Sequence, residues 1–101
     1  MAYTKNVQPV GDWLANGIKT SQLNVCTTAT PLPATALAGR RFILVYNVSG
    51  NTIYVGDSTV TTDNGIVVVN ASSISLSLDA SVILYGIAAG ATNDIRVLEG
   101  A

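Results

Sequence analysis

The residues best suited to chemistry in this sequence are two acids and an amide in one polar segment, residues 56–65. Asp57, Asp63 and Asn64 could offer oxygen ligands to a calcium ion, which takes six to eight of them. Their spacing does not match an EF-hand loop. Asp and Asn also bond their own backbone in turns and tolerate left-handed conformations, so turn chemistry alone explains the composition. We therefore expect Asx turns here, with no bound metal and no other cofactor.

The rest of the sequence offers little to catalysis. It contains no histidine and one cysteine, Cys26. The missing histidine excludes Ser-His-Asp and Cys-His nucleophile pairs and His-containing zinc sites. Cys26 lies in a predicted strand, where a lone cysteine is usually a small buried hydrophobe. Because the sequence also lacks paired acids in a plausible cleft, we predict that the protein is not an enzyme and has no catalytic residues.

Two groups of residues have both a functional and a structural interpretation. Tyr46, Tyr54 and Tyr85 could form a stacking platform for bases or sugars, although packing is the commoner use without a basic groove. Arg40 and Arg41 precede the longest apolar run. They could bind a partner by pairing with an acid on a neighbouring subunit, or they could be a solvated strand start. The sequence leaves this choice open.

Composition limits the partners. The 101 residues are 49% hydrophobic and 11% charged, which is typical of one domain with its own core and argues against disorder. A net charge of −1 gives no field that would attract nucleic acid or an anionic membrane. The sequence shows neither a signal peptide nor an apolar run of about 20 residues, the length of a membrane helix. A chain so poor in charge often covers its exterior with other subunits, so we expect a homo-oligomer.

From residue 22 onward the hydrophobic pattern is that of β-strands. Serine-glycine-asparagine at 49–51 predicts a hairpin between two of them, and the proline-containing segment 30–33 should interrupt the sheet. Seven or eight short strands with almost no helix predict an antiparallel β-sandwich, of which a jelly roll is one form. The predicted strands are 22–28, 41–48, 52–55, 66–69, 73–78, 82–87 and 94–99, with 34–38 either an edge strand or a connection.

Residues 1–21 differ from the sandwich domain predicted at 22–101. They follow neither a period of 2 nor one of 3.6 for more than a few residues, so we interpret them as an N-terminal arm. Each large apolar side chain left in water would forgo roughly 1.5–3 kcal/mol of burial energy. We therefore expect the arm to lie on its own domain or on a neighbour. Its predicted partner-binding residues are Tyr3, Val7, Val10, Trp13, Leu14 and Ile18.

One stretch of the chain is similar to a known family. Residues 38–47 (AGRRFILVYN), 51–56 (NTIYVG) and 61–66 (TTDNGI) are followed by 82–88 (VILYGIA) and 93–99 (NDIRVLE). This series resembles the core of small β-sandwich virion proteins of tailed bacteriophages, and it leaves the arm outside. Such a core occurs in head decoration proteins, head fibres and tail-associated proteins alike. The resemblance therefore implies a virion structural protein.

The resemblance also suggests a role. We expect a capsid decoration (cement) protein, made in the host cytoplasm, that binds the major capsid protein or other virion proteins on the capsid surface. A homo-oligomer is expected, with a trimer favoured. The alternative is a receptor- or glycan-binding module of a tail or head fibre, which would use residues 56–65 and the strand tyrosines. A single-strand nucleic-acid binder of the OB type is disfavoured by the acidic balance.

Overall fold

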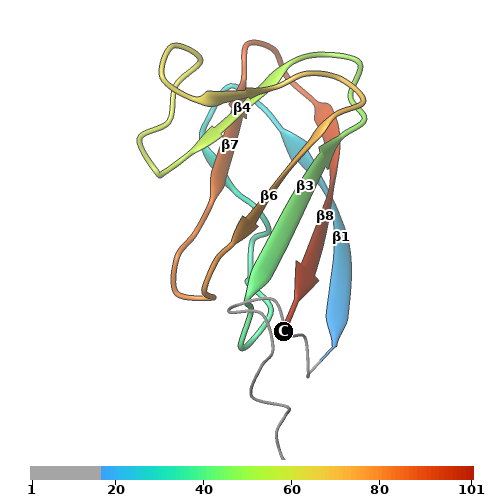
Figure 1. The fold of residues 1–101 in the computed structure, drawn as a ribbon. Helices are drawn as coiled ribbons and strands as arrows, with labels where there is room; N and C mark the ends of the chain where they lie inside the picture. Colours follow the sequence, from blue (N-terminus) through green and yellow to red (C-terminus); the bar gives the residue numbers. More distant parts are fainter. Residues whose placement is uncertain (1–16) are drawn as a thin grey trace, which may run out of the picture.

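The computed structural model describes residues 17–101 (Figure 1). These residues contain eight strands and no helix, and therefore no helix long and apolar enough to span a membrane. The strands are β1 (Ile18–Val25), β2 (Thr30–Pro31), β3 (Phe42–Asn47), β4 (Ile53–Gly56), β5 (Ile66–Val68), β6 (Ser73–Ser77), β7 (Tyr85–Ala88) and β8 (Asn93–Gly100).

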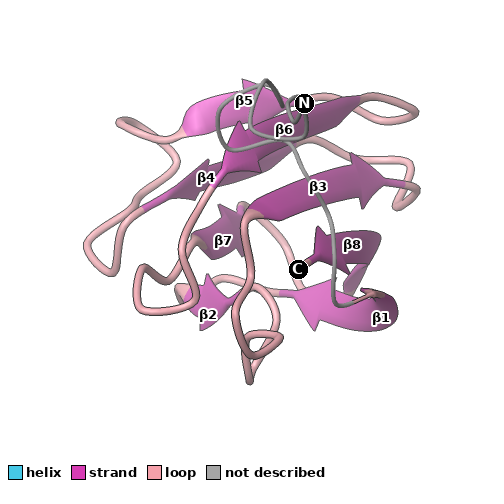
Figure 2. Cartoon of the chain, turned by 60° about the horizontal axis from the view of Figure 1, so that its bottom comes forward, coloured by secondary structure: helices cyan, strands magenta, loops and turns pink. Residues whose placement is uncertain are grey.

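The strands form two antiparallel sheets, which we call sheet A (β1-β8-β3-β6) and sheet B (β2-β7-β4-β5). The pairing is nested, since β1 pairs with β8, β2 with β7, β3 with β6 and β4 with β5. The chain is thus one long hairpin whose paired halves alternate between two sheets, which is jelly-roll topology. In Figure 2, β1, β8 and β3 lie on one side and β2, β7 and β4 on the other. The predicted β-sandwich is confirmed in its jelly-roll form.

The core lies between the sheets because each strand turns alternate residues inward. On β8 the inward residues include Ile95 and Val97, which are two positions apart as the period of a strand requires. Leu76 of β6 lies opposite the inward residue Ile43, but it is 36% exposed because β6 is the edge strand of sheet A. The buried cluster consists of Val25, Leu32, Ile43, Val45, Ile53, Val55, Val68, Leu84, Ala88, Ile95 and Val97.

The predicted hairpin at 49–51 is wrong. The turn exists, but it carries the chain from sheet A to sheet B, so β3 and β4 do not pair. The side chain of buried Asn47 holds this crossing together. Its Nδ2 donates to the carbonyl oxygens of Asn51 (2.7 Å) and Val68 (2.8 Å), and its Oδ1 accepts from the amide of Ser49 (2.9 Å). These side-chain bonds replace the strand ladder that a hairpin would have made.

The predicted boundary between the arm and the sandwich lies inside a strand. β1 begins at Ile18 and pairs with β8 along its whole length. Lys19 and Ser21 share the inward side with Leu23, while Thr20 faces outward. Because the inward positions of this half are polar, no alternation of hydrophobicity marks the strand. The first half of β1 is a strand because its backbone pairs with that of β8.

Two other differences concern the segment after β1. Thr30–Pro31 was predicted to break the sheet, yet it forms a two-residue edge strand against β7. Proline is tolerated at an edge because its missing N–H is not needed there. Residues 34–38 are a connection and not a strand, which was one of the two outcomes the sequence allowed.

Candidate interaction surface

The outer face of sheet A carries apolar side chains that point away from the core. Phe42, Leu44 and Tyr46 of β3 point outward, Leu98 of β8 lies beside Leu44, and Ile18 of β1 lies at the margin. Ile18 is 66% exposed and Tyr46 is 38% exposed, whereas the other three are half-buried. A strand that is apolar on both sides is typical of one covered on both sides. In residues 17–101 only the inner side of β3 is covered by a sheet.

A hollow of about 400 Å³ lies on this face, where β1, β8 and β3 run side by side. The charges at its rim are already paired. The Arg96 guanidinium binds the carboxylate of Asp94, which also accepts from Gln22 Nε2 at 2.8 Å. A large apolar or aromatic side chain would fill such a hollow without stranding a charge. The hollow is lined by Thr20, Ser21, Gln22, Leu44, Arg96, Val97 and Leu98.

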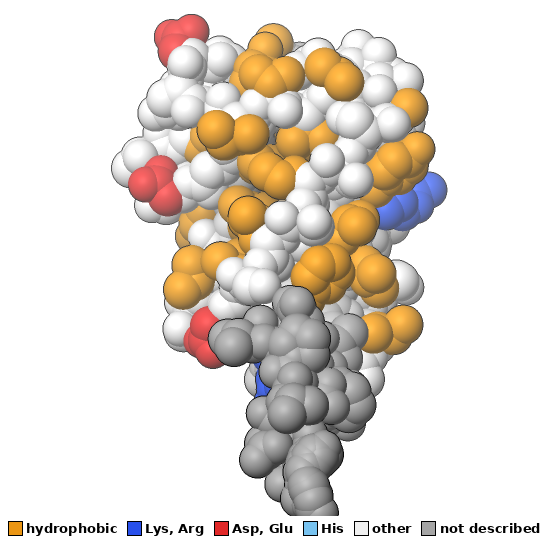
Figure 3. All heavy atoms as spheres, viewed as in Figure 1, with side chains coloured by type: hydrophobic (Ala, Val, Ile, Leu, Met, Phe, Trp, Pro, Cys, Tyr) orange, Lys and Arg blue, Asp and Glu red, His pale blue; other side chains and the backbone are white. Residues whose placement is uncertain are grey.

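On the side of β6, the neighbours of the hollow are polar and uncharged. Ser73, Ser75 and Ser77 of β6 lie beside the outward residues of β3. Figure 3 shows one face of the molecule, on which hydrophobic side chains lie among uncharged polar atoms and charged groups sit mainly at the margins. A surface of this kind can pack against another protein without charge repulsion. In the isolated chain, the polar atoms of this surface can be hydrated.

The three strand tyrosines do not form one platform. Tyr46 lies on the outer face of sheet A, whereas Tyr54 and Tyr85 belong to sheet B. In sheet B, Tyr54 pairs with Ile87 and with Val67, and Val67 is 56% exposed. The two outer faces therefore each have an apolar character, but no surface unites the three rings.

Arg40 is a buried residue and not a partner-binding one, so the prediction of an inter-subunit ion pair is wrong for it. Its side chain is 1% exposed, and its Nη1 donates to Glu99 Oε2 at 2.8 Å. Nη2 donates to the carbonyl oxygens of Val82 (2.6 Å) and Asp79 (3.1 Å), and Nε donates to that of Leu78 (3.2 Å). The acid that was expected on a neighbouring subunit belongs to the same chain.

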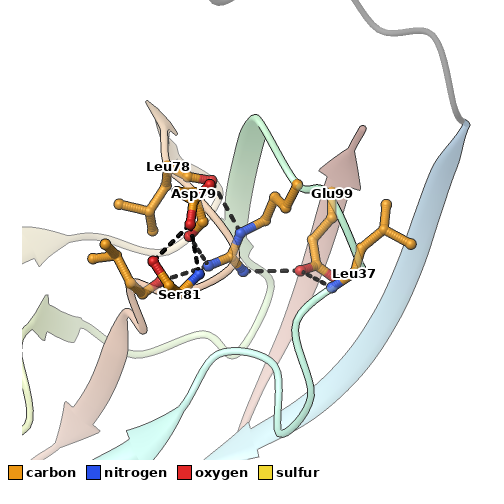
Figure 4. Close-up of polar contacts among 7 residues, drawn as sticks. Leu37, Leu78, Asp79, Ser81 and Glu99 are labelled. Carbon is orange, nitrogen blue, oxygen red and sulfur yellow. Dashed lines mark hydrogen bonds and ion pairs between the residues drawn. The ribbon is translucent and has the colours of Figure 1, made fainter.

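Glu99 completes this cluster from the end of β8. Its Oε2 also accepts from the amide of Leu37 at 2.9 Å, so the pair joins three segments of the chain (Figure 4). Oε1 is buried and is the one such side-chain atom without a hydrogen bond in residues 17–101. The burial of Glu99 could have been predicted from the sequence, because Glu99 is two positions after Val97 and four after Ile95, and alternate residues of a strand face the same side.

The other predicted partner residues divide into two groups. Ile18 and Arg41 are exposed at the starts of β1 and β3, and their role at a partner contact stays a prediction. Tyr3, Val7, Val10, Trp13 and Leu14 lie outside the described residues. Cys26, predicted to be buried in a strand, follows β1 and is half-buried.

The oxygens of the candidate calcium loop are used in turns. Asp57 Oδ1 accepts from the hydroxyl (2.7 Å) and the amide (2.9 Å) of Thr59, and these bonds lower the pKa of the carboxyl. Asn64 Oδ1 accepts from the amide of Thr61 at 2.8 Å. Residues 17–101 hold no group of three or more His, Cys, Asp or Glu side chains placed to bind a metal ion. The geometry therefore supports the Asx-turn interpretation.

A similar turn at Asp79 predicts a dependence of stability on pH. Its carboxylate accepts from the hydroxyl (2.6 Å) and amide (2.9 Å) of Ser81, and these bonds hold its pKa below the ordinary 3.8. Because the folded pKa lies below the unfolded one, this stabilisation is present above pH 3.8 and is lost as the pH falls through the folded pKa. We expect Ser81→Ala to reduce the loss of stability between about pH 7 and about pH 3 in urea unfolding. An unchanged difference between the two pH values would contradict this role of Ser81.

No protein-family model, no curated protein and no solved structure matches the chain.

Proposed function

We propose that the protein is a structural subunit of a tailed-bacteriophage virion that decorates the outer capsid surface as a homo-oligomer. The observation that carries the proposal is the outer face of sheet A, which combines an apolar hollow with the serines of β6 on one side and a mutually paired Asp94 and Arg96 at its rim. Jelly rolls are common in viral capsid and lectin domains, which agrees with the proposal but does not by itself imply a function. The resemblance of residues 37–99 to virion proteins supports the same role.

The chemistry of the surface suits a permanent assembly. Fully buried interface centres are depleted in charge and enriched in aromatic side chains. On sheet A the exposed Ile18 and Tyr46 would be buried at such a contact, and the neighbouring Asp94 and Arg96 already neutralise each other. The partner is the major capsid protein or another virion protein, and further copies of this chain complete the oligomer, with a trimer favoured.

Removal of residues 2–16 should abolish attachment to capsids while the sandwich stays folded. The truncation ends before Gly17 because Ile18 begins β1 and the Gly17 carbonyl accepts from the amide of Ala101 at 2.9 Å. Co-sedimentation with undecorated capsids measures attachment, and circular dichroism measures the fold. A cryo-EM map of the virion places the subunit. Truncated protein that decorates with unchanged occupancy would show that the arm has no part in attachment, and a virion map without the subunit would refute the function.

A second candidate function has one observation in its favour. A second hollow, of about 310 Å³, lies where the start of β4, the end of β7 and the start of β8 meet. Its lining is a mixture of aromatic and amide groups that would suit a sugar, and consists of Asn51, Thr52, Tyr54, Ala88, Ala89, Gly90 and Asn93. However, Asn51 Nδ2 donates to Asn93 Oδ1 at 3.0 Å, so the amides largely bond within the protein. A fibre-type receptor module would bind a glycan array in a manner that Tyr54→Ala abolishes.

A further inference from the structure

The side of the sandwich formed by β5 and β6 is open. β5 is an edge strand of sheet B and β6 an edge strand of sheet A, and Figure 2 shows both at the same side. Ile66 of β5 lies opposite the buried Val55 and so has an inward position. Leu76 of β6 likewise lies opposite the buried Ile43. Yet Ile66 is 60% exposed and Leu76 is 36% exposed, so side chains directed toward the core remain in contact with water.

β6 directs unused backbone groups away from β3. Just beyond one end of β6, the amide of Leu78 donates to the carbonyl of Arg41 at 3.0 Å. Just before the other end, the carbonyl of Ser72 accepts from the amide of Asn47 at 2.9 Å. The even-numbered residues of β6 therefore direct their N–H and C=O groups toward β3 and the odd-numbered ones to the other side, which we call the free edge. The structure describes no further strand there. The residues that face the free edge are Ser73, Ser75 and Ser77.

The free edge of β6 lacks the features that usually prevent edge strands from pairing. Proteins protect such edges with charged side chains, prolines or β-bulges. β6 has the sequence Ser-Ile-Ser-Leu-Ser and pairs with β3 at five consecutive positions, without a bulge. Residues 64–78 contain no charged residue and no proline. Another strand can therefore approach this edge without meeting a charge or a missing N–H donor.

We propose that two copies of this chain pair antiparallel through β6, about a two-fold axis at Ser75, and so join their A sheets into one. In a two-fold contact, residue i of one copy meets residue j of the other, and j meets i. Ser75 then lies opposite its counterpart, and Ser73 lies opposite Ser77. Because the facing serines direct their backbone groups to the free edge, each such pair can exchange two hydrogen bonds.

The side chains of β6 match themselves in this register. Serine meets serine on the outer face, and Ile74 meets Leu76 on the inner face, which is the face that Val45 and Ile43 share. A two-fold contact also places each patch against itself, so a charge within the patch would approach its like. The uncharged β6 avoids this repulsion. The contact would also bring apolar surface of the second copy to the open side, where Ile66 and Leu76 are exposed.

This contact goes beyond the proposed function, because it assigns the surface through which two copies meet and requires no capsid. Pairing at an edge extends a sheet without covering its faces, so the outer face of sheet A stays available to another partner. A two-fold contact cannot by itself form the trimer that is favoured above. Dimer and trimer are therefore separate outcomes, and neither decides whether the protein decorates capsids.

Proline at position 75 tests the contact. Ser75→Pro removes an N–H that faces the free edge and not β3, so the sandwich should stay folded by circular dichroism. Ser75→Ala keeps the N–H and is the matched control. We expect the unmodified protein and Ser75→Ala to sediment as dimers and Ser75→Pro to sediment as a monomer. A monomer or a trimer of the unmodified protein, or a dimer that survives Ser75→Pro, would overturn the proposal. Dimers formed only after removal of residues 2–16 would overturn it in favour of the arm as the occupant of this edge.

Disulfide formation tests the register and also decides the case in which Ser75→Pro does not fold. The protein is the full chain carrying Cys26→Ala. In the proposed pair the two Cα atoms of residue 75 are about 5.5 Å apart, which a disulfide can bridge. Ser77→Cys is the matched control, because Ser77 is also exposed on the outer face but would lie about 13 Å from its counterpart. We expect Ser75→Cys to form cross-linked dimers about tenfold faster than Ser77→Cys, or more. Equal rates, or no cross-link at position 75, would overturn the proposal.

Discussion

Replacing Arg40 by alanine should lower the free energy of unfolding by about 3–5 kcal/mol, because it leaves the carboxylate of Glu99 buried without its counter-charge. Three carbonyl oxygens, those of Leu78, Asp79 and Val82, lose their donor at the same time. Single domains are stable by only about 5–15 kcal/mol, so the variant would lose a large share of its stability. Urea or guanidinium unfolding measures the change.

Arg41→Ala is the matched control for this variant. Arg41 is the next residue and is exposed, so its replacement should cost about 1 kcal/mol or less. The double variant Arg40→Met with Glu99→Leu should cost less than Arg40→Ala, because an apolar pair leaves no buried charge. A cost for Arg40→Ala no larger than that of Arg41→Ala would show that the buried pair does not hold the end of the sandwich together.

Replacing Asn47 should have the second largest effect, because its amide group holds the crossing between the sheets. Asn47→Ala leaves the carbonyl oxygen of Val68 buried without its side-chain donor and removes the acceptor of the Ser49 amide. We expect a loss of about 2–4 kcal/mol, since each buried polar group left unpaired costs about 1–3 kcal/mol. Unfolding by denaturant, followed by circular dichroism, measures the change.

Two further variants separate hydrogen bonding from packing at this crossing. Asn47→Asp keeps the shape and the acceptor but turns an oxygen toward the carbonyls of Asn51 and Val68, so it should destabilise more than Asn47→Ala. Asn51→Ala removes one side-chain bond, to Oδ1 of the buried Asn93, and should cost about 1–2 kcal/mol, less than Asn47→Ala. If Asn47→Asp were as stable as the unchanged protein, the carbonyl contacts would not be those that hold the turn.

The amino-acid sequence determined the features that depend on near neighbours in the chain. Strand alternation is a property of the backbone with a period of two, so the inward positions Ile95 and Val97 were predictable from residues 93–99 alone. Turn chemistry is equally local, and Asp57 and Asn64 form the Asx turns expected of them. The all-β class follows from these two signals. Where the inward residues were polar, as at Lys19 and Ser21 of β1, the local signal was absent and the first half of the strand was missed.

Tertiary structure alone decided which strands meet. A turn at 49–51 suits a hairpin or a crossing between sheets equally well, and the choice depends on Val68, whose carbonyl receives the Asn47 amide from 21 positions away. Arg40 and Glu99 are separated by 59 positions, so no local pattern could show that each is the other's counter-charge. The antiparallel pairing of β3 with β8 brings them together. Contacts between residues so far apart in the sequence form only when the whole core is buried at once. A hydrophobic pattern along the chain therefore cannot predict them.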